Sequence, residues 1–486
     1  MKGLLNELDP QEVFRYFEKL TQIPRGSGNE EEVSDYLVEF AQSQGLDYIQ
    51  ETCKNIIINK PATKGYENAP KVILQGHLDI VCAKEETLNF DFEKDPIPLV
   101  VEGDLIKTQG TTLGADNGIA VAMAMGILAS SDLKHPKISA LFTVSEETGM
   151  DGAVALNPDN ISGDILINID SEEEGTALSS CAGGVNAYVF LPFKKESCRK
   201  DMEFYEISIK GLLGGHSGIE IDKNRANAIK LMARVLKNID QEMIYKLASI
   251  RGGEKMNAIA KMCSAVIVIE KGRIKKLEEV LNRMQNYFSR EFEISDPEIK
   301  IYIKSSDRAN EIFEESSKRK LMHILRLLPQ GVETMSSKMP GLVESSNNVG
   351  VIETQANEVF INNAIRSSVS SLKDEIVNRI KIISITNNAR CVLDADYPEW
   401  EYKIESPIRE LMKNRYEILR NEPLKIDAIH AGLECGLLKK KVGDIDMISI
   451  GPNIYDVHTP NERLSISSTK NVYNFLCDVL EHIKNI

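Results

Sequence analysis

The sequence predicts an α/β protein with a mostly parallel sheet, helices on both of its faces, and an inserted α+β domain. In both terminal parts of the chain, short apolar runs alternate with helical patterns, as they do around parallel sheets. The middle part has the order strand, helix, strand, strand, helix, strand, which is typical of a ferredoxin-like unit. We therefore place one domain at residues 1–186 and 397–486, interrupted by an inserted domain at 187–396.

The N-terminal part begins with two amphipathic helices and continues with buried strands. The apolar spacing predicts helices at 10–24, 29–44 and 114–130, and strands at 71–75, 138–144 and 164–169. The helix at 114–130 consists of small and apolar residues on every side, as expected for a helix that is buried all round. The run ISALFTV at 138–144 is mostly apolar and predicts another buried strand.

The inserted part predicts one ferredoxin-like unit and a second stretch that resembles it. The first unit has strands at 203–211, 243–250, 259–270 and 298–306, with helices at 222–239 and 272–290. The second stretch has helices at 308–327 and 372–384, with strands at 332–338, 346–354, 357–366 and 389–396. We therefore expect the β-α-β-β-α-β character to be doubled. The α/β pattern then returns, with helices at 405–420, 433–440 and 467–486 and strands at 424–430 and 446–450.

The charge of the chain excludes some classes of partner. Its 486 residues include 58 Lys and Arg against 73 Asp and Glu, a net charge of −15, which does not attract nucleic acid or an anionic membrane. The sequence contains no uninterrupted run of about 18 apolar residues, so no transmembrane helix is predicted. The opening MKGLLNELDPQEVF lacks an apolar signal-peptide core, so we expect a cytoplasmic protein. Eight cysteines without C-x-x-C spacing indicate idle thiols and not a thiolate zinc site.

Imidazole and carboxylate side chains follow the predicted core strands and open the buried helix. The segments are GHLD at 76–79, GADNG at 114–118, SEETG at 145–149, DSE at 170–172 and DVHTP at 456–460. Ligands of open α/β sheets lie outside the carboxyl ends of the strands, so these segments should meet at one edge. Nitrogen and oxygen donors without sulfur suit zinc, manganese or cobalt at a two-metal hydrolytic site.

Each of these side chains also has a simpler structural explanation. A lone His77 after a strand is commonly a structural hydrogen-bond donor, and Asp116 before a helix is commonly an N-cap. Paired acids such as Glu146 and Glu147 are commonly a charged helix start. Because five such segments recur at five element ends, and glycine flanks nearly all of them, the metal hypothesis is favoured for the set.

The motifs GHLDIV, GADNG, SEETG, NID and DVHTPNE resemble the dinuclear metallopeptidase superfamily of carboxypeptidase G, aminoacylase and the carnosinases. With GLLGGHSG and HAGLECG, the chain looks like the bacterial aminoacyl-histidine (Xaa-His, or beta-alanyl-histidine) dipeptidases, from TQIPRGSGNEEEV to the last helix. The resemblance implies a catalytic domain at 1–186 and 397–486, a lid at 187–396, and hydrolysis of unblocked dipeptides of Xaa-His type or more broadly. The implied cofactors are two divalent ions, zinc or else manganese or cobalt.

The resemblance also implies roles for individual residues of the catalytic domain. The implied metal ligands are His77 and Asp170 for one ion, Glu147 and His458 for the other, and Asp116 as the bridge. Asp79 would hold the second ring nitrogen of His77, which fixes the tautomer and raises ligand basicity. Glu146 would be the general base and later the proton donor to the leaving amine. The Asp116–Asn117 peptide bond is expected to be cis.

Four further residues are implied in substrate handling. His216, in the glycine-rich GGHSG segment, would donate a hydrogen bond to the oxyanion of the transition state. Arg366 would bind the C-terminal carboxylate of a dipeptide through its guanidinium fork. Asn257 and His430 are further substrate-binding candidates by resemblance. From the sequence alone, a surface histidine at position 216 and a solvated strand end at position 366 remain the simpler interpretations.

Two alternative functions stay open. Another amidohydrolase of the superfamily, such as an aminoacylase or a carboxypeptidase, would share the metal ligands and differ in the lid, which is usually a single β-α-β-β-α-β unit. A non-catalytic metal-binding scaffold would be signalled by loss of Glu146 or of a ligand, and none is lost. The expected partners are small peptide substrates, with no nucleic acid and no membrane, and the protein is expected to be a monomer or a homodimer.

Overall fold

The computed structural model describes residues 3–486 and divides into two compact units. The first unit contains the chain up to Cys181, Trp400–Ala428 and Leu433–Ile486, and the second contains Ala182–Glu399 and Ile429–Gly432. Residues 429–432 were expected in the first domain but group with the second. The reason is local: the His430 ring nitrogen Nε2 lies 2.7 Å from the hydroxyl of Ser346, and Ile429 accepts a backbone hydrogen bond from Ala182.

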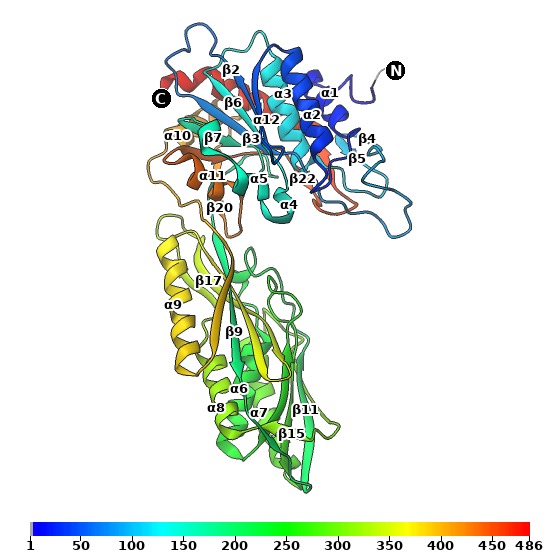
Figure 1. The fold of residues 1–486 in the computed structure, drawn as a ribbon, viewed down its shortest axis with the longest axis vertical. Helices are drawn as coiled ribbons and strands as arrows, with labels where there is room; N and C mark the ends of the chain where they lie inside the picture. Colours follow the sequence, from blue (N-terminus) through cyan, green and yellow to red (C-terminus); the bar gives the residue numbers. More distant parts are fainter. Residues whose placement is uncertain (1–2) are drawn as a thin grey trace. The chain divides into compact units, whose positions relative to one another are not determined.

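The first unit is built from α-helices around a central sheet (Figure 1). Its helices are α1 (Gln11–Leu20), α2 (Glu31–Ser43), α3 (Ala115–Ala129), α4 (Glu146–Gly149), α5 (Asp151–Ala155), α10 (Pro407–Arg420), α11 (Glu434–Val442) and α12 (Ile466–His482), with short 3-10 turns η1 (Pro158–Asn160) and η3 (Ile483–Asn485). Its strands are β1 (Asp47–Gln50), β2 (Ile56–Lys60), β3 (Val72–His77), β4 (Val100–Glu102), β5 (Leu105–Lys107), β6 (Ile138–Thr143), β7 (Ile165–Asn168), β8 (Thr176–Cys181), β20 (Lys425–Ile429), β21 (Asp446–Ser449), β22 (Ile454–Tyr455) and β23 (Arg463–Ser465).

The central sheet has the strand order β1-β2-β6-β3-β7-β21-β8-β20. The neighbours β6, β3, β7 and β21 are parallel, whereas β1, β2 and β8 pair antiparallel with their neighbours. The parallel part is therefore the centre of the sheet, as predicted, and the edges make the whole sheet mixed. In this register His77 lies opposite Thr143, and Gln75 lies opposite Asn168. The carboxyl ends of three central strands thus lie at one edge.

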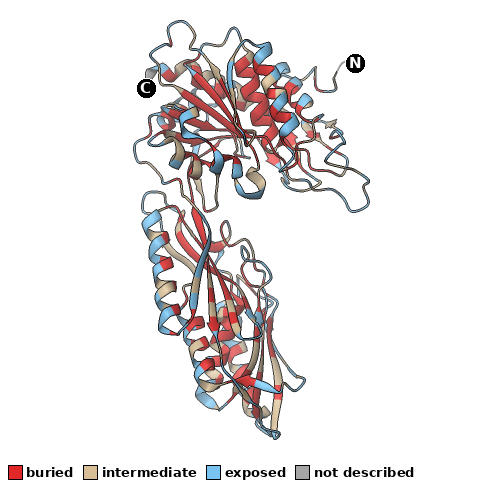
Figure 2. Ribbon diagram, in the orientation of Figure 1, coloured by how far each residue is buried: buried red, intermediate tan, exposed pale blue. Residues whose placement is uncertain are grey.

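The core of the first unit explains why α3 carries no charge beyond its first turn. Strand β3 and strand β6 are buried at every residue, and α3 is buried along almost its whole length (Figure 2). Helix α1 packs beside α3, and its Val13, Phe14 and Phe17 are fully buried (Figure 1). Apolar residues on all sides of α3 therefore find apolar neighbours, and its N-terminus is fixed against the sheet edge.

The second unit contains a nine-stranded sheet and a separate two-stranded one, β10-β15. Its strands are β9 (Gly183–Pro192), β10 (Lys195–Ser197), β11 (Met202–Lys210), β12 (Lys246–Gly252), β13 (Cys263–Glu270), β14 (Lys300–Ser305), β15 (Glu311–Phe313), β16 (Gly331–Met335), β17 (Val343–Thr354), β18 (Glu358–Ser367) and β19 (Arg390–Tyr397). Its helices are α6 (Ala228–Glu242), α7 (Ile274–Glu291), α8 (Glu315–Leu327) and α9 (Ser370–Thr386), with the 3-10 turn η2 (Ile221–Lys223).

The nine-stranded sheet is two ferredoxin-like halves joined edge to edge. Its order is β14-β11-β13-β12-β17-β18-β9-β19, with β16 paired to β17. The first half runs β11-α6-β12-β13-α7-β14 along the chain, as predicted. The second half takes β9 as its first strand, before the whole first half, and continues with α8, β17, β18, α9 and β19. The halves meet where Arg251 and Gly252 pair with Glu353 and Ile352.

Helix α6 begins six residues later than the sequence predicts. The predicted start was Asp222, but the structure begins the helix at Ala228. Asn227 is the N-cap, because its side-chain oxygen accepts the backbone N–H groups of Ile229 and Lys230 at 3.0 and 3.3 Å.

Two further properties of the described residues are the state of the cysteines and the character of the helices. All eight cysteines are free thiols. None of the helices within residues 3–486 combines the length and apolar character that a membrane span requires.

Candidate functional site

Five segments of the first unit bring the predicted metal ligands to the carboxyl edge of the central sheet. His77 is the last residue of β3, Glu147 lies in the short helix α4 after β6, and Asp170 follows β7. Asp116 lies in the first turn of α3, and His458 lies in the loop between β22 and β23. The sequence explains these positions locally, because each apolar strand is followed directly by a polar side chain and a turn.

Asp116 stands between two groups of ligands. Its Oδ1 lies 3.1 Å from Nε2 of His77, and its Oδ2 lies 3.0 Å from Nε2 of His458. The His77 group is completed by Asp170, whose Oδ1 lies 3.5 Å from the His77 Nε2 atom. The His458 group is completed by Glu147, at 2.9 Å from the His458 Nε2 atom. Within each group the potential ligand atoms lie within 4.8 Å of one another. The structure thus brings all five predicted ligands together.

Asp79 is fully buried behind His77 and binds more than the imidazole. Its carboxylate lies 3.3 Å from Nδ1 of His77 and accepts the hydroxyl of Ser27 at 2.7 Å. It also accepts the backbone N–H groups of Glu146 and Glu147, at 2.9 and 3.1 Å. Burial opposes ionisation, but these contacts bring the pKa of Asp79 down to about 2. One carboxylate therefore orients both a predicted ligand and the start of α4.

The electrostatics of the cluster suit divalent cations. Burial, together with the charges of Asp170, Glu434 and Glu147, raises the pKa of Glu146 to about 9. Burial and neighbouring carboxylates raise the pKa of Asp170 to about 6. Four carboxyl groups of the cluster thus face only two imidazoles, and divalent ions bound by these oxygen and nitrogen donors would compensate the negative charge that burial disfavours.

The turn at Asp116 has the predicted conformation. The Asp116–Asn117 peptide bond is cis. The Asn117 side chain accepts the backbone N–H of His77 at 3.2 Å and donates to the carbonyl of Ile169 at 2.8 Å. It therefore links the segments that carry His77, Asp116 and Asp170.

His216 lies in the second unit, and its contacts determine its tautomer. Its Nδ1 accepts the backbone N–H groups of Gly218 and Ile219, both at 3.2 Å. Burial, with the charge of Arg366, lowers the pKa of His216. The ring is therefore neutral, and the proton resides on Nε2. A neutral histidine with an N–H at Nε2 is a hydrogen-bond donor.

Arg366 and Asn257 line one cavity of about 490 Å³ in the second unit, together with Tyr397. Arg366 donates from Nη1 to the hydroxyl of Tyr397 at 2.9 Å, while its buried Nε has no hydrogen-bond partner among residues 3–486. A buried guanidinium N–H without an acceptor favours an anionic ligand there. His430 is also buried in this unit; burial and Arg366 lower its pKa to about 3, so the ring is neutral.

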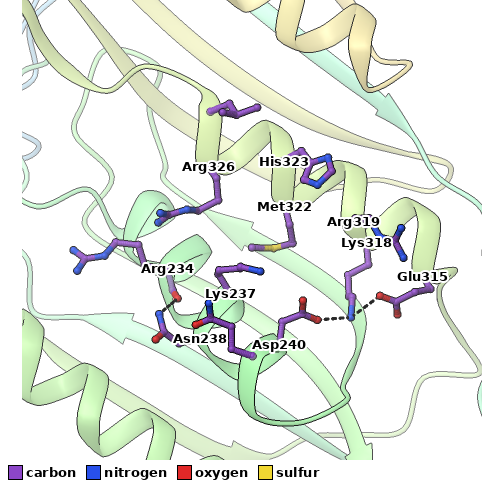
Figure 3. Close-up of a pocket in the computed structure, with 12 residues that line it drawn as sticks. Arg234, Lys237, Asn238, Asp240, Glu315, Lys318, Arg319, Met322, His323 and Arg326 are labelled. Atoms are coloured by element: carbon purple, nitrogen blue, oxygen red, sulfur yellow. Dashed lines mark hydrogen bonds and ion pairs between the residues drawn. The ribbon is translucent and has the colours of Figure 1, made fainter.

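A second cavity, of about 520 Å³, lies between α6 and α8 (Figure 3). Its lining is rich in cations, including Lys237, Arg319 and Arg326, while Lys318 is paired with Asp240 and Glu315. None of the predicted site residues lines it. The cavity is therefore separate from the residues that the motifs selected.

Sequence reasoning missed Glu434, which lies in the HAGLECG segment four residues after His430. Its carboxylate is fully buried in the first unit and accepts Gln75 Nε2 at 2.6 Å and Thr143 Oγ1 at 2.7 Å. Burial raises the pKa of Glu434 to about 7, and Asp170 adds to the rise. The signal available in the sequence was an acid that opens a helix inside a motif already noted.

Comparison with known proteins agrees with the fold and the motifs. Residues 207–296 match the peptidase dimerisation domain of the M20 family. The chain is 36% identical over 479 residues to the cytosol non-specific dipeptidase of Escherichia coli (strain K12), covering 99% of both chains. The crystal structure of aminoacylhistidine dipeptidase from Vibrio alginolyticus superposes with a TM-score of 0.95 at 34% identity, covering 99% of this chain and 98% of that one.

A more distant structure, aminopeptidase PepT from Bacillus cereus, shares the fold at 15% identity and a TM-score of 0.58, covering 98% of this chain and 99% of that one. The two dipeptidases cover the chain equally fully but at more than twice that identity, 36% and 34%. The protein belongs to the M20 peptidase family, in the group that contains these two dipeptidases.

Proposed function

We propose that this protein is a two-metal dipeptidase that hydrolyses the peptide bond of unblocked dipeptides, of the Xaa-His type or more broadly. The observation that carries the proposal is the position of Asp116, whose two carboxylate oxygens each face a different histidine. That arrangement is what a carboxylate bridge between two metal ions requires. The names of the two similar proteins, a non-specific dipeptidase and an aminoacylhistidine dipeptidase, support the substrate class.

The proposed ions are zinc, with manganese or cobalt as alternatives, because imidazole and carboxylate accept all three. His77 and Asp170 would hold one ion, Glu147 and His458 the other, and Asp116 both. Bound divalent ions supply Lewis acidity toward the scissile carbonyl. Asp79 holds the His77 ring through Nδ1, so Nε2 is left to face the metal.

Glu146 is the proposed general base. It lies beside Glu147 in α4, and its backbone N–H is held by Asp79. Burial and the neighbouring carboxylates raise its pKa above that of an ordinary carboxyl group, and the positive charge of bound metal ions would lower it again toward the range of a base at neutral pH. Glu146 would take the proton of the attacking water and pass it to the leaving amine.

The second unit supplies the proposed donors for substrate. His216, protonated at Nε2, would donate to the oxyanion of the transition state. Arg366 would bind the substrate carboxylate, with Asn257 beside it and His430 as a further binding residue. A dipeptide has both termini free, so a site built for them rejects blocked peptides, whose termini leave buried partners unpaired.

The proposed location is cytoplasmic, and the proposed assembly is a monomer or a homodimer. The printed name of the Escherichia coli relative supports the location. Light scattering on the purified protein distinguishes the two assemblies.

The test is hydrolysis of a small panel of dipeptides, with and without His at the second position, each alongside its N-acetyl and C-amide forms. We expect cleavage of the unblocked peptides and poor cleavage of the blocked ones. Equal rates for peptides with and without His would establish broad specificity. Efficient cleavage of N-acetyl amino acids would contradict the proposal and support an aminoacylase.

A further inference from the structure

We infer that Glu462, together with Arg25, is a positioning residue that holds the segment of the bridging ligand Asp116 in place for metal binding. Glu462 lies four residues after His458, at the end of the DVHTPNE segment. Its side chain is only 2% exposed. The inference rests on the proposed metal centre but not on the identity of the substrate.

Glu462 accepts four consecutive backbone N–H groups. Its Oε2 accepts those of residues 113 and 114 at 2.8 and 3.1 Å, and its Oε1 accepts those of residues 115 and 116 at 2.8 and 3.2 Å. These include the first amides of α3, which have no acceptor inside the helix. The negative charge also lies at the N-terminal end of the helix, where the helix dipole favours it.

Only a carboxylate can make this set of contacts. An ionised carboxylate has about four acceptor positions and no hydrogen. A glutamine at position 462 would keep one acceptor oxygen but would turn an NH₂ group toward two N–H donors. Aspartate would keep the charge, but its side chain is shorter by one methylene.

Arg25 supplies the opposite charge and joins a third segment. It is 1% exposed and donates from Nη1 to the carbonyl of Leu78 at 2.7 Å and from Nη2 to the carbonyl of Gly114 at 2.6 Å. Leu78 lies between His77 and Asp79. Burial lowers the pKa of Arg25 to about 10, and the charge of Glu462 opposes this shift.

The glycines of the GADNG segment make room for Arg25. Gly114 has φ +71°, a conformation that L side chains rarely adopt, and a Cβ there would lie 2.8 Å from Nη2 of Arg25. A Cβ at Gly118 would lie closer still to the same nitrogen. The glycines of this segment therefore leave the space that the Arg25 guanidinium occupies beside the proposed ligand Asp116.

Two buried charged residues thus connect three segments that are distant in the sequence. Arg25 ties the His77 segment to the Asp116 segment, and Glu462 ties the Asp116 segment to the His458 segment. Each proposed metal ion takes ligands from two of these segments. Because Asp116 would bind both ions, a change in the position of its backbone should weaken both sites.

The test is zinc binding by the metal-free full-length Glu462→Gln variant, measured against a competing chelator. We expect the affinity for zinc to fall by about 10- to 100-fold, as it does when outer partners of metal ligands are lost. Glu462→Asp should lie between Glu462→Gln and wild type. Zinc binding at the wild-type affinity in both variants would make Glu462 a merely structural residue and overturn the inference.

Asp446→Asn is the matched control. Asp446 is also a carboxylate of the first unit, and it accepts the hydroxyl of Ser406 at 2.7 Å and the backbone N–H of Ile408 at 3.0 Å. It lies at the first residue of β21, the opposite end of that strand from the ligand edge. We expect unchanged zinc affinity in this variant, whatever its thermal stability.

Two other measurements test the inference even if the Glu462→Gln variant does not fold. In the metal-free wild-type protein, hydrogen exchange at the amides of residues 113–116 should be slow, because a buried carboxylate accepts all four. Arg25→Lys keeps the charge but cannot reach two carbonyls with a fixed fork, so it should also weaken zinc binding. Fast exchange in the wild-type protein, or wild-type zinc affinity in Arg25→Lys, would contradict the inference. No peptide is present in these experiments, so a failure of the dipeptidase assay cannot produce either result.

Discussion

At the scale of single residues, Glu146 has a strongly perturbed environment, because burial and the neighbouring carboxylates raise the pKa of its carboxyl group. We predict that Glu146→Gln keeps its metal content while kcat falls by at least about 10²-fold, the low end for loss of a general acid–base group. Metal analysis and steady-state kinetics on the same preparation check this. Near-wild-type turnover, or loss of metal, would remove Glu146 from the role of base.

His216 offers a separate prediction, because its Nδ1 is occupied by two backbone amides and its Nε2 carries the proton. An oxyanion donor acts mainly in the transition state, so His216→Ala should lose about 10²–10³ in kcat. Both metals should remain bound. The kinetics separate the two possible roles: a change confined to KM would make His216 a substrate-binding residue.

His430 should make the stability of the protein depend on pH. Burial and the charge of Arg366 lower its pKa from 6.5 to about 3, so the folded state keeps the ring neutral where the unfolded state takes up a proton. The free energy of unfolding therefore falls as the pH decreases from 6.5 toward 3. Between about pH 6.5 and 5, we expect this fall to be smaller in His430→Gln by about 1.6 kcal/mol. Denaturant unfolding at several pH values measures it, and parallel curves for the two proteins would contradict the prediction.

At the scale of elements, the start of α6 shows what a sequence pattern cannot place. The apolar periodicity identified the helix, but its first residue is determined by Asn227, whose side chain caps the helix and also donates to the carbonyl of Val349 at 2.9 Å. That second contact comes from β17, more than 100 residues along the chain. Long-range contacts of this kind leave no local trace in the sequence.

We predict that Asn227→Ala destabilises the second unit by about 1–2 kcal/mol, because the cap is lost and the Val349 carbonyl is left without this donor. Asn286→Ala, at an exposed position within α7, is the control. Thermal or denaturant unfolding of both variants is the measurement. Equal stability of Asn227→Ala and wild type would show that other groups cap the helix.

The positions of the proposed metal ligands were predictable, because each follows an apolar strand or opens a buried helix. His77 and Asp170 could be placed at one sheet edge as soon as their strands were expected to be parallel. The contacts of Asp79 with the amides of α4 were not predictable, since they join residues that are 67 and 68 positions apart. Glu434 was missed because nothing in its own segment shows that Gln75 and Thr143 lie beside it.

At the scale of the whole molecule, the doubling of the second unit was predicted from element order, but its connectivity was not. The predicted second stretch begins with a helix at 308–327, whereas its first strand, β9, comes before the entire first half in the sequence. Pairing of β9 with β18 over Gly183–Pro192 supplies it. A strand separated from its partners by a complete inserted unit can be assigned only when the sheet is seen.

The central claim is that two metal ions, held by ligands on both sides of Asp116, are required for hydrolysis of unblocked dipeptides. The most direct test removes the metals with a chelator and titrates zinc back while the hydrolysis of one unblocked dipeptide is followed. We expect no activity without metal, full activity at two equivalents of zinc per chain, and no cleavage of the N-acetyl form at any point. Full activity in the presence of the chelator, or equal cleavage of the blocked peptide, would contradict the claim.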